Sequence, residues 1–337
     1  MSTLPKFSKS AASEYAPPTE RPVCDLTLAQ AIDTIPFEKF NFNPQFADKD
    51  PYILISSGSF SPITILHVQL LTMVRDYIMV EKQAGHVLGA LLSPVHDAYG
   101  KPSLIDQNHR IKMCQLATED IPWIGVSTVE TAQSKWVETR LIFDLLRMSI
   151  THVFKQVSVE LSSNSQHSQS ISTQLKVTPR LVFCMGSDVF LGFREQSWWS
   201  HEDVKEYCTT YRLAVLLREE DAEKVETLLT THPVLSRHRD SIWIIPPTYQ
   251  NTISSTLIRK QLAKGGSIHG LVHPKVEEYI ITNNLYRPTG PSAAPLTKPD
   301  ASEQNYIRLF STKPTFDTPP IVIATECPIP LDLFQDQ

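Results

Sequence analysis

Short apolar segments alternate with helical patterns through the middle of this chain, and this alternation most strongly constrains its fold. The apolar segments cover residues 52–55, 87–92, 181–184, 213–217 and 242–245. The helical patterns cover residues 64–81, 106–117, 136–154, 221–229, 255–264 and 274–283. Continuous apolar runs are typical of parallel strands that are covered on both faces. The pattern therefore predicts an α/β fold with a doubly wound parallel sheet.

A turn of small residues follows the first predicted strand. Residues 58–67 read GSFSPITILH, directly after that strand and before a helical pattern. Gly58 lets the backbone approach a ligand closely, and a helix start offers free N–H groups and the positive end of its dipole. If Thr64 caps the helix, His67 lies in the first turn, within reach of a phosphate. The turn predicts a phosphate site, although such turns are also common structural punctuation.

A second helix start has the same character. Residues 253–259 read ISSTLIR, so hydroxyl residues precede the helix and can cap its N–H groups, which could equally bind a phosphate. Ser255 and Arg259 are four residues apart and point from one helix face. The guanidinium offers a fixed fork of donors that suits phosphate oxygens. The alternative for this segment alone is a plain cap followed by a solvated arginine.

Composition excludes several classes of protein. The 31 Lys and Arg against 36 Asp and Glu give a net charge of −5, which provides no general basic surface for nucleic acid or an anionic membrane. Five scattered cysteines without CxxC spacing predict free thiols in a reducing compartment. The N-terminus has no apolar signal core, so we expect a cytoplasmic or nuclear protein that is not secreted.

The chain is predicted to hold a single catalytic domain with flanking extensions. Residues 51–287 form that domain, interrupted by a flexible Ser/Gln-rich insertion at about residues 160–178. Residues 1–50 form an N-terminal extension that we expect to be partly disordered, with a helical piece at 26–35. Residues 288–337 form a Pro-rich tail.

Further motifs lie in order between the two phosphate elements. Residues 93–101 read SPVHDAYGK, residues 136–139 read WVET and residues 186–188 read GSD. With His109-Arg110, Trp199 and the segment around Tyr286, they resemble the eukaryotic nicotinamide mononucleotide adenylyltransferases of the nucleotidyltransferase superfamily. The resemblance runs from about residue 52 to 286 and implies a Rossmann-like nucleotidyltransferase fold.

The resemblance implies adenylyl transfer from ATP to nicotinamide mononucleotide, and to nicotinic acid mononucleotide, in NAD biosynthesis. NAD or deamido-NAD and pyrophosphate would form by in-line attack, which depends on alignment and charge neutralisation. His67, Lys101 and Arg259 are the implied catalytic residues. Mg²⁺ would arrive with ATP, held by phosphates and not by protein ligands. The implied phosphate-binding residues are Gly58, Ser59, Phe60, His67, Ser254, Ser255, Thr256 and Arg259.

The resemblance also implies a pocket for the nicotinamide nucleotide and for NAD. A flat cationic pyridinium binds well against an aromatic face such as Trp136 or Trp199, although core packing is the alternative for either ring. Thr139 would contact the carboxamide, and Asp188 would accept from a sugar hydroxyl. The implied residues are Ser59, Tyr99, Lys101, Trp136, Thr139, Gly186, Asp188, Trp199 and Asn251.

Four positions depart from the family pattern. Ser61 replaces an Asn that is usual in many relatives, and His96 replaces a Gly in the SPV-x-DAY loop. Pro247 lies where relatives often have an acidic residue, which puts one contact near the dinucleotide in doubt. Ser187 replaces a small apolar residue, a change from which we expect little effect.

Two alternative functions stay open at this stage. One is another adenylyl- or cytidylyltransferase of the superfamily, such as a pantetheine-phosphate adenylyltransferase, against which the Trp136, Thr139 and Trp199 pocket argues. The other is a non-catalytic, nucleotide-binding or chaperone-like relative, against which intact His67, Lys101 and Arg259 argue. The expected partners are ATP, both mononucleotides and NAD, without nucleic acid or membrane. Because relatives are commonly oligomeric, we expect a homo-oligomer.

Overall fold

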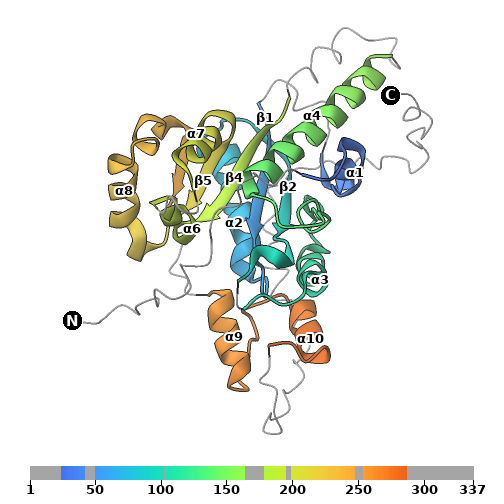
Figure 1. Cartoon of the computed structure of the whole chain (residues 1–337), viewed down its shortest axis with the longest axis vertical. Helices are drawn as coiled ribbons and strands as arrows, with labels where there is room; N and C mark the ends of the chain where they lie inside the picture. The colour runs from blue at the N-terminus through green and yellow to red at the C-terminus, as the bar shows by residue number, and fades with distance from the viewer. Residues whose placement is uncertain are drawn as a thin grey trace.

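Six parallel strands form one sheet in the order β3-β2-β1-β4-β5-β6 (Figure 1). The computed structural model describes residues 24–41, 50–101, 103–163, 178–194, 199–246 and 253–286. The strands are β1 Pro51–Gly58, β2 His86–Pro94, β3 Ile124–Val126, β4 Arg180–Gly186, β5 Arg212–Leu216 and β6 Ile242–Ile245. This order is that of a doubly wound dinucleotide-binding sheet, whose direction of winding reverses between β1 and β4. The predicted fold class is confirmed.

Helices connect the strands and cover the sheet. The α-helices are α1 Leu28–Asp33, α2 Ile65–Asp76, α3 Gln107–Thr118, α4 Thr139–Ser163, α6 Ser187–Leu191, α7 His201–Thr210, α8 Ala222–Thr231, α9 Ser255–Ala263 and α10 Pro274–Thr282. A π-helical turn extends α2 over Tyr77–Glu81. Short 3-10 turns lie at Phe37–Lys39, Asp97–Tyr99, Gly192–Arg194, Glu219–Asp221, Leu235–Arg237 and Arg239–Ser241. None of the helices in the described ranges is long and apolar enough to cross a membrane.

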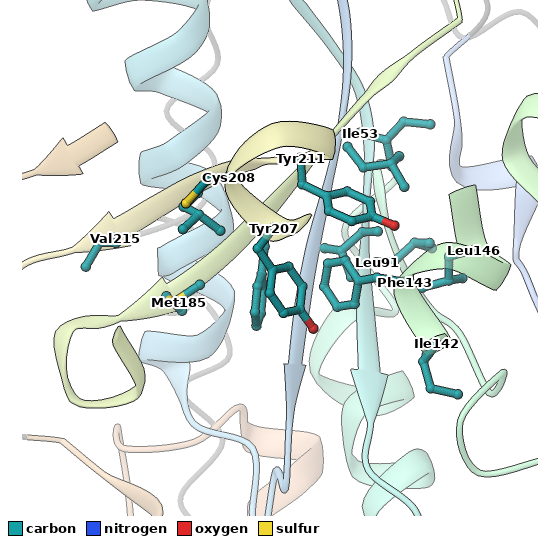
Figure 2. Packing of buried hydrophobic residues seen from close by; sticks show 14 of the residues in the cluster. Ile53, Leu91, Ile142, Phe143, Leu146, Met185, Tyr207, Cys208, Tyr211 and Val215 are labelled. Atoms are coloured by element: carbon teal, nitrogen blue, oxygen red, sulfur yellow. The ribbon is translucent and has the colours of Figure 1, made fainter. Parts of the chain in front are cut away.

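Both faces of the sheet are buried, which explains the continuous apolar runs. In β1, Ile53 and Ile55 face one layer, whereas Leu54 faces the other. The first layer packs against α1, α4, α6, α7 and α8. Figure 2 shows the aromatic rings of this layer, in which the centroids of Phe143 in α4 and Tyr207 in α7 are 5.8 Å apart. The second layer packs against α2, α3, α9 and α10.

The structure adds elements that the sequence patterns did not reveal. Strand β3 has three residues, too few to show a pattern, and α7 reads HEDVKEYCTT, in which only Val204, Tyr207 and Cys208 are buried. Helix α4 begins at Thr139, three residues later than predicted, because Trp136 and Val137 belong to the segment that leads into it. It continues to Ser163, past the predicted start of the insertion.

Part of the N-terminal extension packs on the catalytic domain. Residues 24–41, here called the N-terminal strap, contain α1 and the turn Phe37–Lys39. The α1 helix lies within the helical piece predicted at 26–35. Ala31, Ile35 and Phe40 of the strap are buried in the same hydrophobic layer as α4. The strap is therefore part of the core on that face of the sheet.

Candidate active site

A cavity of about 730 Å³ opens at the carboxyl edge of the sheet. The ends of β1, β4 and β5 meet the starts of α2 and α9 there, as expected for parallel strands. The Gly58, Gly186 and Ser254 turns therefore gather at one edge of the sheet. The predicted site residues in the cavity lining are Gly58, Ser59, Phe60, His67, Tyr99, Lys101, Thr139, Gly186, Asp188, Trp199, Ser254, Ser255, Thr256 and Arg259.

The turn after β1 is shaped by one buried ring. Phe60 has a φ of 42°, which is uncommon for a residue other than glycine, and its side chain is buried in the core. The ring meets the His67 imidazole edge to face, with centroids 5.2 Å apart. A Cβ on Gly58 would lie 3.3 Å from this same ring. Buried Phe60 therefore holds the turn against α2 and leaves its backbone beside the cavity.

The start of α2 determines the tautomer of His67. The backbone N–H of Thr64 donates to Nδ1 of His67 at 2.9 Å, and the Thr64 hydroxyl lies 2.9 Å from the same nitrogen. Because an N–H must donate, Nδ1 accepts and the neutral ring carries its proton on Nε2. Burial, together with the charges of Arg218 and Lys101, lowers the pKa of His67 to about 4 against the opposite effect of Asp188. His67 is thus a neutral N–H donor on the cavity wall.

The start of α9 contacts the turn after β1 directly. Ser254 is the N-cap and accepts from the N–H of Leu257 at 3.1 Å. The Ser255 hydroxyl donates to the carbonyl of Pro62 at 2.8 Å, and Nη1 of Arg259 donates to the carbonyl of Ser61 at 2.7 Å. The two predicted phosphate elements, far apart in sequence, therefore form one unit beside the cavity.

The cavity lining beside the start of α9 carries the positive charges of Lys101 and Arg259. Burial lowers the pKa of Lys101, and the nearby Arg259 lowers it further, while Asp188 acts in the opposite direction. Burial also lowers the pKa of Arg259. Asp188 lies 3.7 Å from Arg218, which also lines the cavity. Two partly desolvated cations near one another favour an anion between them.

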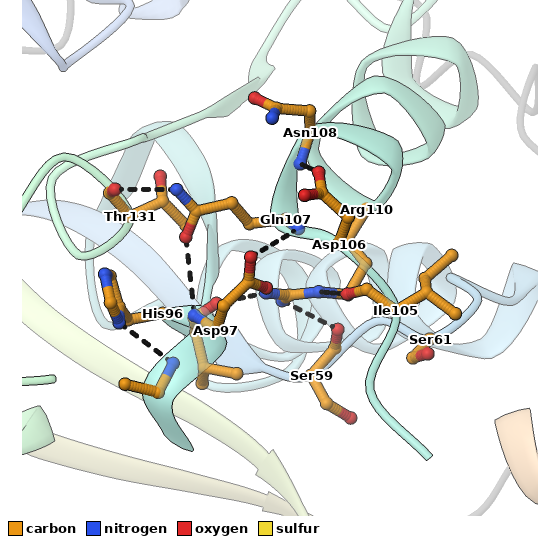
Figure 3. Close-up of polar contacts among 12 residues, drawn as sticks. Ser59, Ser61, His96, Asp97, Ile105, Asp106, Gln107, Asn108, Arg110 and Thr131 are labelled. Carbon is orange, nitrogen blue, oxygen red and sulfur yellow. Dashed lines mark hydrogen bonds and ion pairs between the residues drawn. The ribbon is translucent and has the colours of Figure 1, made fainter. Parts of the chain in front are cut away.

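Arg110 joins the loops that form the cavity floor, and Figure 3 shows its contacts. Its side chain is fully buried, and Nη1 donates to the carbonyl of Ser59 at 3.2 Å. Nη2 donates to the carbonyl of Val95 at 2.7 Å and to the carboxylate of Asp97 at 2.8 Å. Nε donates to the carbonyl of Ile105 at 2.8 Å. One guanidinium thus connects the turn after β1, the loop after β2 and the segment before α3.

Sequence reasoning assigned Arg110 no role, although a signal for it exists. Arg110, Met113, Cys114 and Ala117 follow the i, i+3, i+4, i+7 spacing of one helix face, and all four are buried in α3. A charged residue on an apolar helix face needs partners, because an unpaired buried charge is costly. The pattern therefore indicates a buried network at this point.

A second buried ionisable group lies behind the same loop. Glu130 has no exposed surface, and burial raises its pKa to about 8, although the backbone N–H of His96, the Arg110 charge and the Ser57 hydroxyl lower it. Burial therefore favours the neutral carboxylic acid form of Glu130 near neutral pH. Burial raises the pKa of Tyr99, which lines the cavity, and the nearby Glu130 raises it further.

Two of the four departures, Ser61 and Ser187, are buried and hydrogen-bonded in loops around the site. The Ser61 hydroxyl is buried and donates to the carbonyl of Ser103 at 3.0 Å, with the Tyr286 hydroxyl 3.1 Å away. The Ser187 hydroxyl donates to the carboxylate of Asp221 at 2.8 Å and accepts from the N–H of Arg218 at 3.2 Å.

The remaining departures and pocket residues differ in their placement. His96 caps the turn Asp97–Tyr99, with Nδ1 accepting from the N–H of Ala98 at 3.0 Å. Trp199 lines the cavity, whereas Trp136 is absent from the lining and its indole nitrogen is buried. Pro247 and Asn251 lie outside the described residues.

Comparison with known proteins places the chain in a family. The cytidylyltransferase-like family matches residues 55–261. A Bos taurus nicotinamide/nicotinic acid mononucleotide adenylyltransferase 1 is 32% identical over 257 residues, which span 71% of this chain and 90% of the relative. The chain belongs to this adenylyltransferase family. The resemblance stated from the motifs is confirmed.

Other relatives extend the comparison. An Arabidopsis thaliana nicotinamide/nicotinic acid mononucleotide adenylyltransferase is 28% identical over 252 residues, 75% of this chain and 97% of the relative. A solved Plasmodium falciparum nicotinic acid mononucleotide adenylyltransferase complexed with APC is 20% identical, with a TM-score of 0.46. That similarity covers 70% of this chain and 97% of the Plasmodium chain.

Proposed function

We propose that the protein transfers the adenylyl group of ATP to nicotinamide mononucleotide or nicotinic acid mononucleotide. The products are NAD or deamido-NAD, together with pyrophosphate. Family membership supports the reaction. The observation that carries the assignment to this cavity is the contact between the two phosphate elements, Arg259 to Ser61 and Ser255 to Pro62.

In this proposal the protein supplies alignment and charge neutralisation and contributes no nucleophile. The phosphate of the mononucleotide attacks the α-phosphorus of ATP, the bond to the β-phosphate oxygen breaks, and pyrophosphate leaves. The backbone of Gly58, Ser59 and Phe60 lies beside the reacting phosphates. His67 donates through Nε2, and Lys101 and Arg259 neutralise the charge that develops on the departing phosphates.

The helix start at α9 binds the leaving group in the same proposal. The hydroxyls of Ser254 and Ser255 are engaged in the cap and with Pro62, so free backbone N–H groups at the helix start serve the phosphates. Thr256 accepts from Nη2 of Arg259 at 3.2 Å and helps to orient the guanidinium. The two bonds of Arg259 leave further N–H donors of its fork for phosphate oxygens.

The nucleoside ends of the substrates occupy the rest of the cavity. Thr139, Tyr99 and Trp199 form the proposed nicotinamide side, where an aromatic face suits the cationic pyridinium. Gly186 and Asp188 lie at the end of β4 and face the nucleotide sugar. Trp136 stays a proposed nicotinamide contact on the strength of the family motif alone, because it does not line the cavity.

We propose that Mg²⁺ accompanies ATP. The donors at the phosphate end of the cavity are His67, Lys101, Arg259 and hydroxyl groups, which fit phosphate oxygens and not a metal ion. Phosphates and water would therefore coordinate the cation, whose chemical contribution is to neutralise phosphate charge.

The direct test uses the purified full chain with ATP, Mg²⁺ and each mononucleotide in parallel, with NAD or deamido-NAD measured by chromatography. A third reaction with phosphopantetheine tests the alternative superfamily activity. The proposed function predicts product with at least one nicotinamide-type mononucleotide and none with phosphopantetheine. The reverse pattern would refute it.

A variant tests the catalytic assignment separately. His67→Ala should nearly abolish turnover while the fold persists, because the ring is a donor to the phosphates in the proposal. Unchanged turnover would remove His67 from the mechanism and leave the reaction assignment intact. Cytoplasmic or nuclear localisation, a homo-oligomeric state and the domain limits stay predictions from sequence, to be checked by microscopy, light scattering and limited proteolysis.

A further inference from the structure

The N-terminal strap fits into a groove that two glycines create in the sheet. A Cβ on Gly125 of β3 would clash with Cγ of Pro36, and a Cβ on Gly89 of β2 would clash with the Phe40 ring. These clashes exclude any side chain at either position while the strap is in place. Both glycines belong to the segment that the family matches, whereas residues 24–41 precede its first matched residue.

Three hydrogen bonds connect the strap to residues 128–134 of the catalytic domain, besides those from Lys39 to Ile121 and from Asn41 to Leu88. The N–H of Thr128 donates to the carbonyl of Thr34 at 3.1 Å. Asp25 makes two hydrogen bonds to neighbouring residues. Its N–H donates to Oε1 of Gln133 at 3.0 Å, and its carboxylate accepts from the N–H of Ser134 at 2.9 Å. The hydrogen bonds from Ser134 lower the pKa of Asp25, so it is ionised at neutral pH.

A further contact lies on the other side of the proposed nicotinamide segment. The Cys24 thiol donates to the carbonyl of Leu141 at 3.7 Å. Gln133 and Ser134 precede residues 136–139, and Leu141 follows them, so the strap holds this segment at both ends. Thr139 within it lines the cavity. The strap itself contributes no residue to the cavity lining, so any effect on substrate must pass through this segment.

We propose that the N-terminal strap positions residues 136–139 for the mononucleotide, with Asp25 as its main positioning residue. This inference rests on the proposed function, because it takes Thr139 to be on the mononucleotide side of the cavity. The phosphate elements that hold ATP have no hydrogen bond to the strap among the described residues. The strap should therefore affect the mononucleotide and leave ATP binding unchanged.

The test is steady-state kinetics of the full chain, with ATP and nicotinamide mononucleotide varied separately. Asp25→Ala should raise KM for the mononucleotide about three-fold, as expected for the loss of one hydrogen bond, and leave KM for ATP unchanged. Asp25→Asn keeps an acceptor for the Ser134 N–H and should recover most of the wild-type KM. The matched control is Asp33→Ala, an exposed carboxylate on the same strap, which should change neither KM.

A second variant displaces the strap from a different side. Gly125→Ala puts a methyl group against Pro36 and should also raise KM for the mononucleotide more than KM for ATP. A KM ratio within error of wild type in both Asp25→Ala and Gly125→Ala, or equal rises for both substrates, would overturn the inference. Failure of the proposed function is separate, since the wild-type chain would then form no dinucleotide at all. Circular dichroism establishes that each variant is folded before its kinetics are interpreted.

Discussion

Arg259 donates a hydrogen bond of 2.7 Å to the carbonyl oxygen of Ser61, 198 residues earlier in the chain. Ser255, one turn before Arg259 on α9, donates to the next carbonyl, that of Pro62. These contacts make a single rigid unit of the turn after β1 and the start of α9. The proposed reaction needs such a unit, because it must align the phosphates of two substrates, and alignment supplies most of the rate enhancement in phosphoryl and adenylyl transfer.

Replacement of Arg259 tests that unit. Arg259→Ala should lower kcat about 100-fold or more, because it removes a cation that stabilises developing phosphate charge. Arg259→Lys should recover only part of the rate, since lysine keeps the charge but loses the fork that reaches Ser61 and a phosphate together. Steady-state kinetics with Lys260→Ala as the exposed neighbouring control measures this effect. A fully active lysine variant would show that charge alone matters.

Replacement of Arg110 tests the floor of the cavity. Arg110→Ala leaves the carbonyls of Ser59, Val95 and Ile105 without their donor, so the free energy of unfolding should fall by about 3 kcal/mol or more. Urea unfolding gives this value, and Lys112→Ala, exposed on the same helix, should change it by less than about 0.5 kcal/mol. A loss equal to that of the control would mean that the loops hold their positions without Arg110.

The buried Glu130 predicts a pH dependence of stability. Its pKa is raised from 4.5 to about 8 in the folded chain, so between these values the unfolded state releases a proton that the folded state keeps. The free energy of unfolding should therefore fall as pH rises through this range, by up to about 1.4 kcal/mol per pH unit. It should lose no more from this group above pH 8.

A glutamine variant isolates this contribution. Glu130→Gln cannot ionise, so the difference in unfolding free energy between wild type and variant should shrink or reverse from pH 5 to pH 8. Urea unfolding at four pH values measures the difference, with Glu202→Gln as the exposed control. A difference that is constant with pH would mean that Glu130 is ionised in the folded chain.

Glycine 89 provides a test of the strap's packing that does not involve the substrate. Gly89→Ala places a methyl group into the Phe40 ring and should reduce the free energy of unfolding by about 1–3 kcal/mol. The same substitution in a Phe40→Ala background should cost much less, because the clashing ring is gone. A double-mutant cycle by urea unfolding gives both values, and equal costs in the two backgrounds would contradict the contact.

Local patterns were sufficient for the elements that have strong periodicity. The runs at 52–55 and 87–92 are continuous because both faces of β1 and β2 are buried, and they were predicted as strands for that reason. Strand β3 escaped prediction because three residues carry no period, and α7 because only three of its ten residues are buried. Whether so small a face is buried depends on the other elements that pack against it, and the local sequence pattern does not show those elements.

Sequence by itself determined the chemistry available to this protein: the small-residue turn at Gly58, His67 in the first turn of the helix that follows, and Arg259 on the second helix start. Those features depend on residues close together in the chain, so short-range spacing reveals them. Tertiary structure alone decided that Arg259 would contact Ser61, that Arg110 would join three loops, and that the strap would occupy a groove opened by Gly89 and Gly125. Arg259 and Ser61 are 198 positions apart, and Arg110 and Val95 are 15 positions apart. Both arginines donate to backbone carbonyls, which every residue carries, so no local pattern specifies the partner.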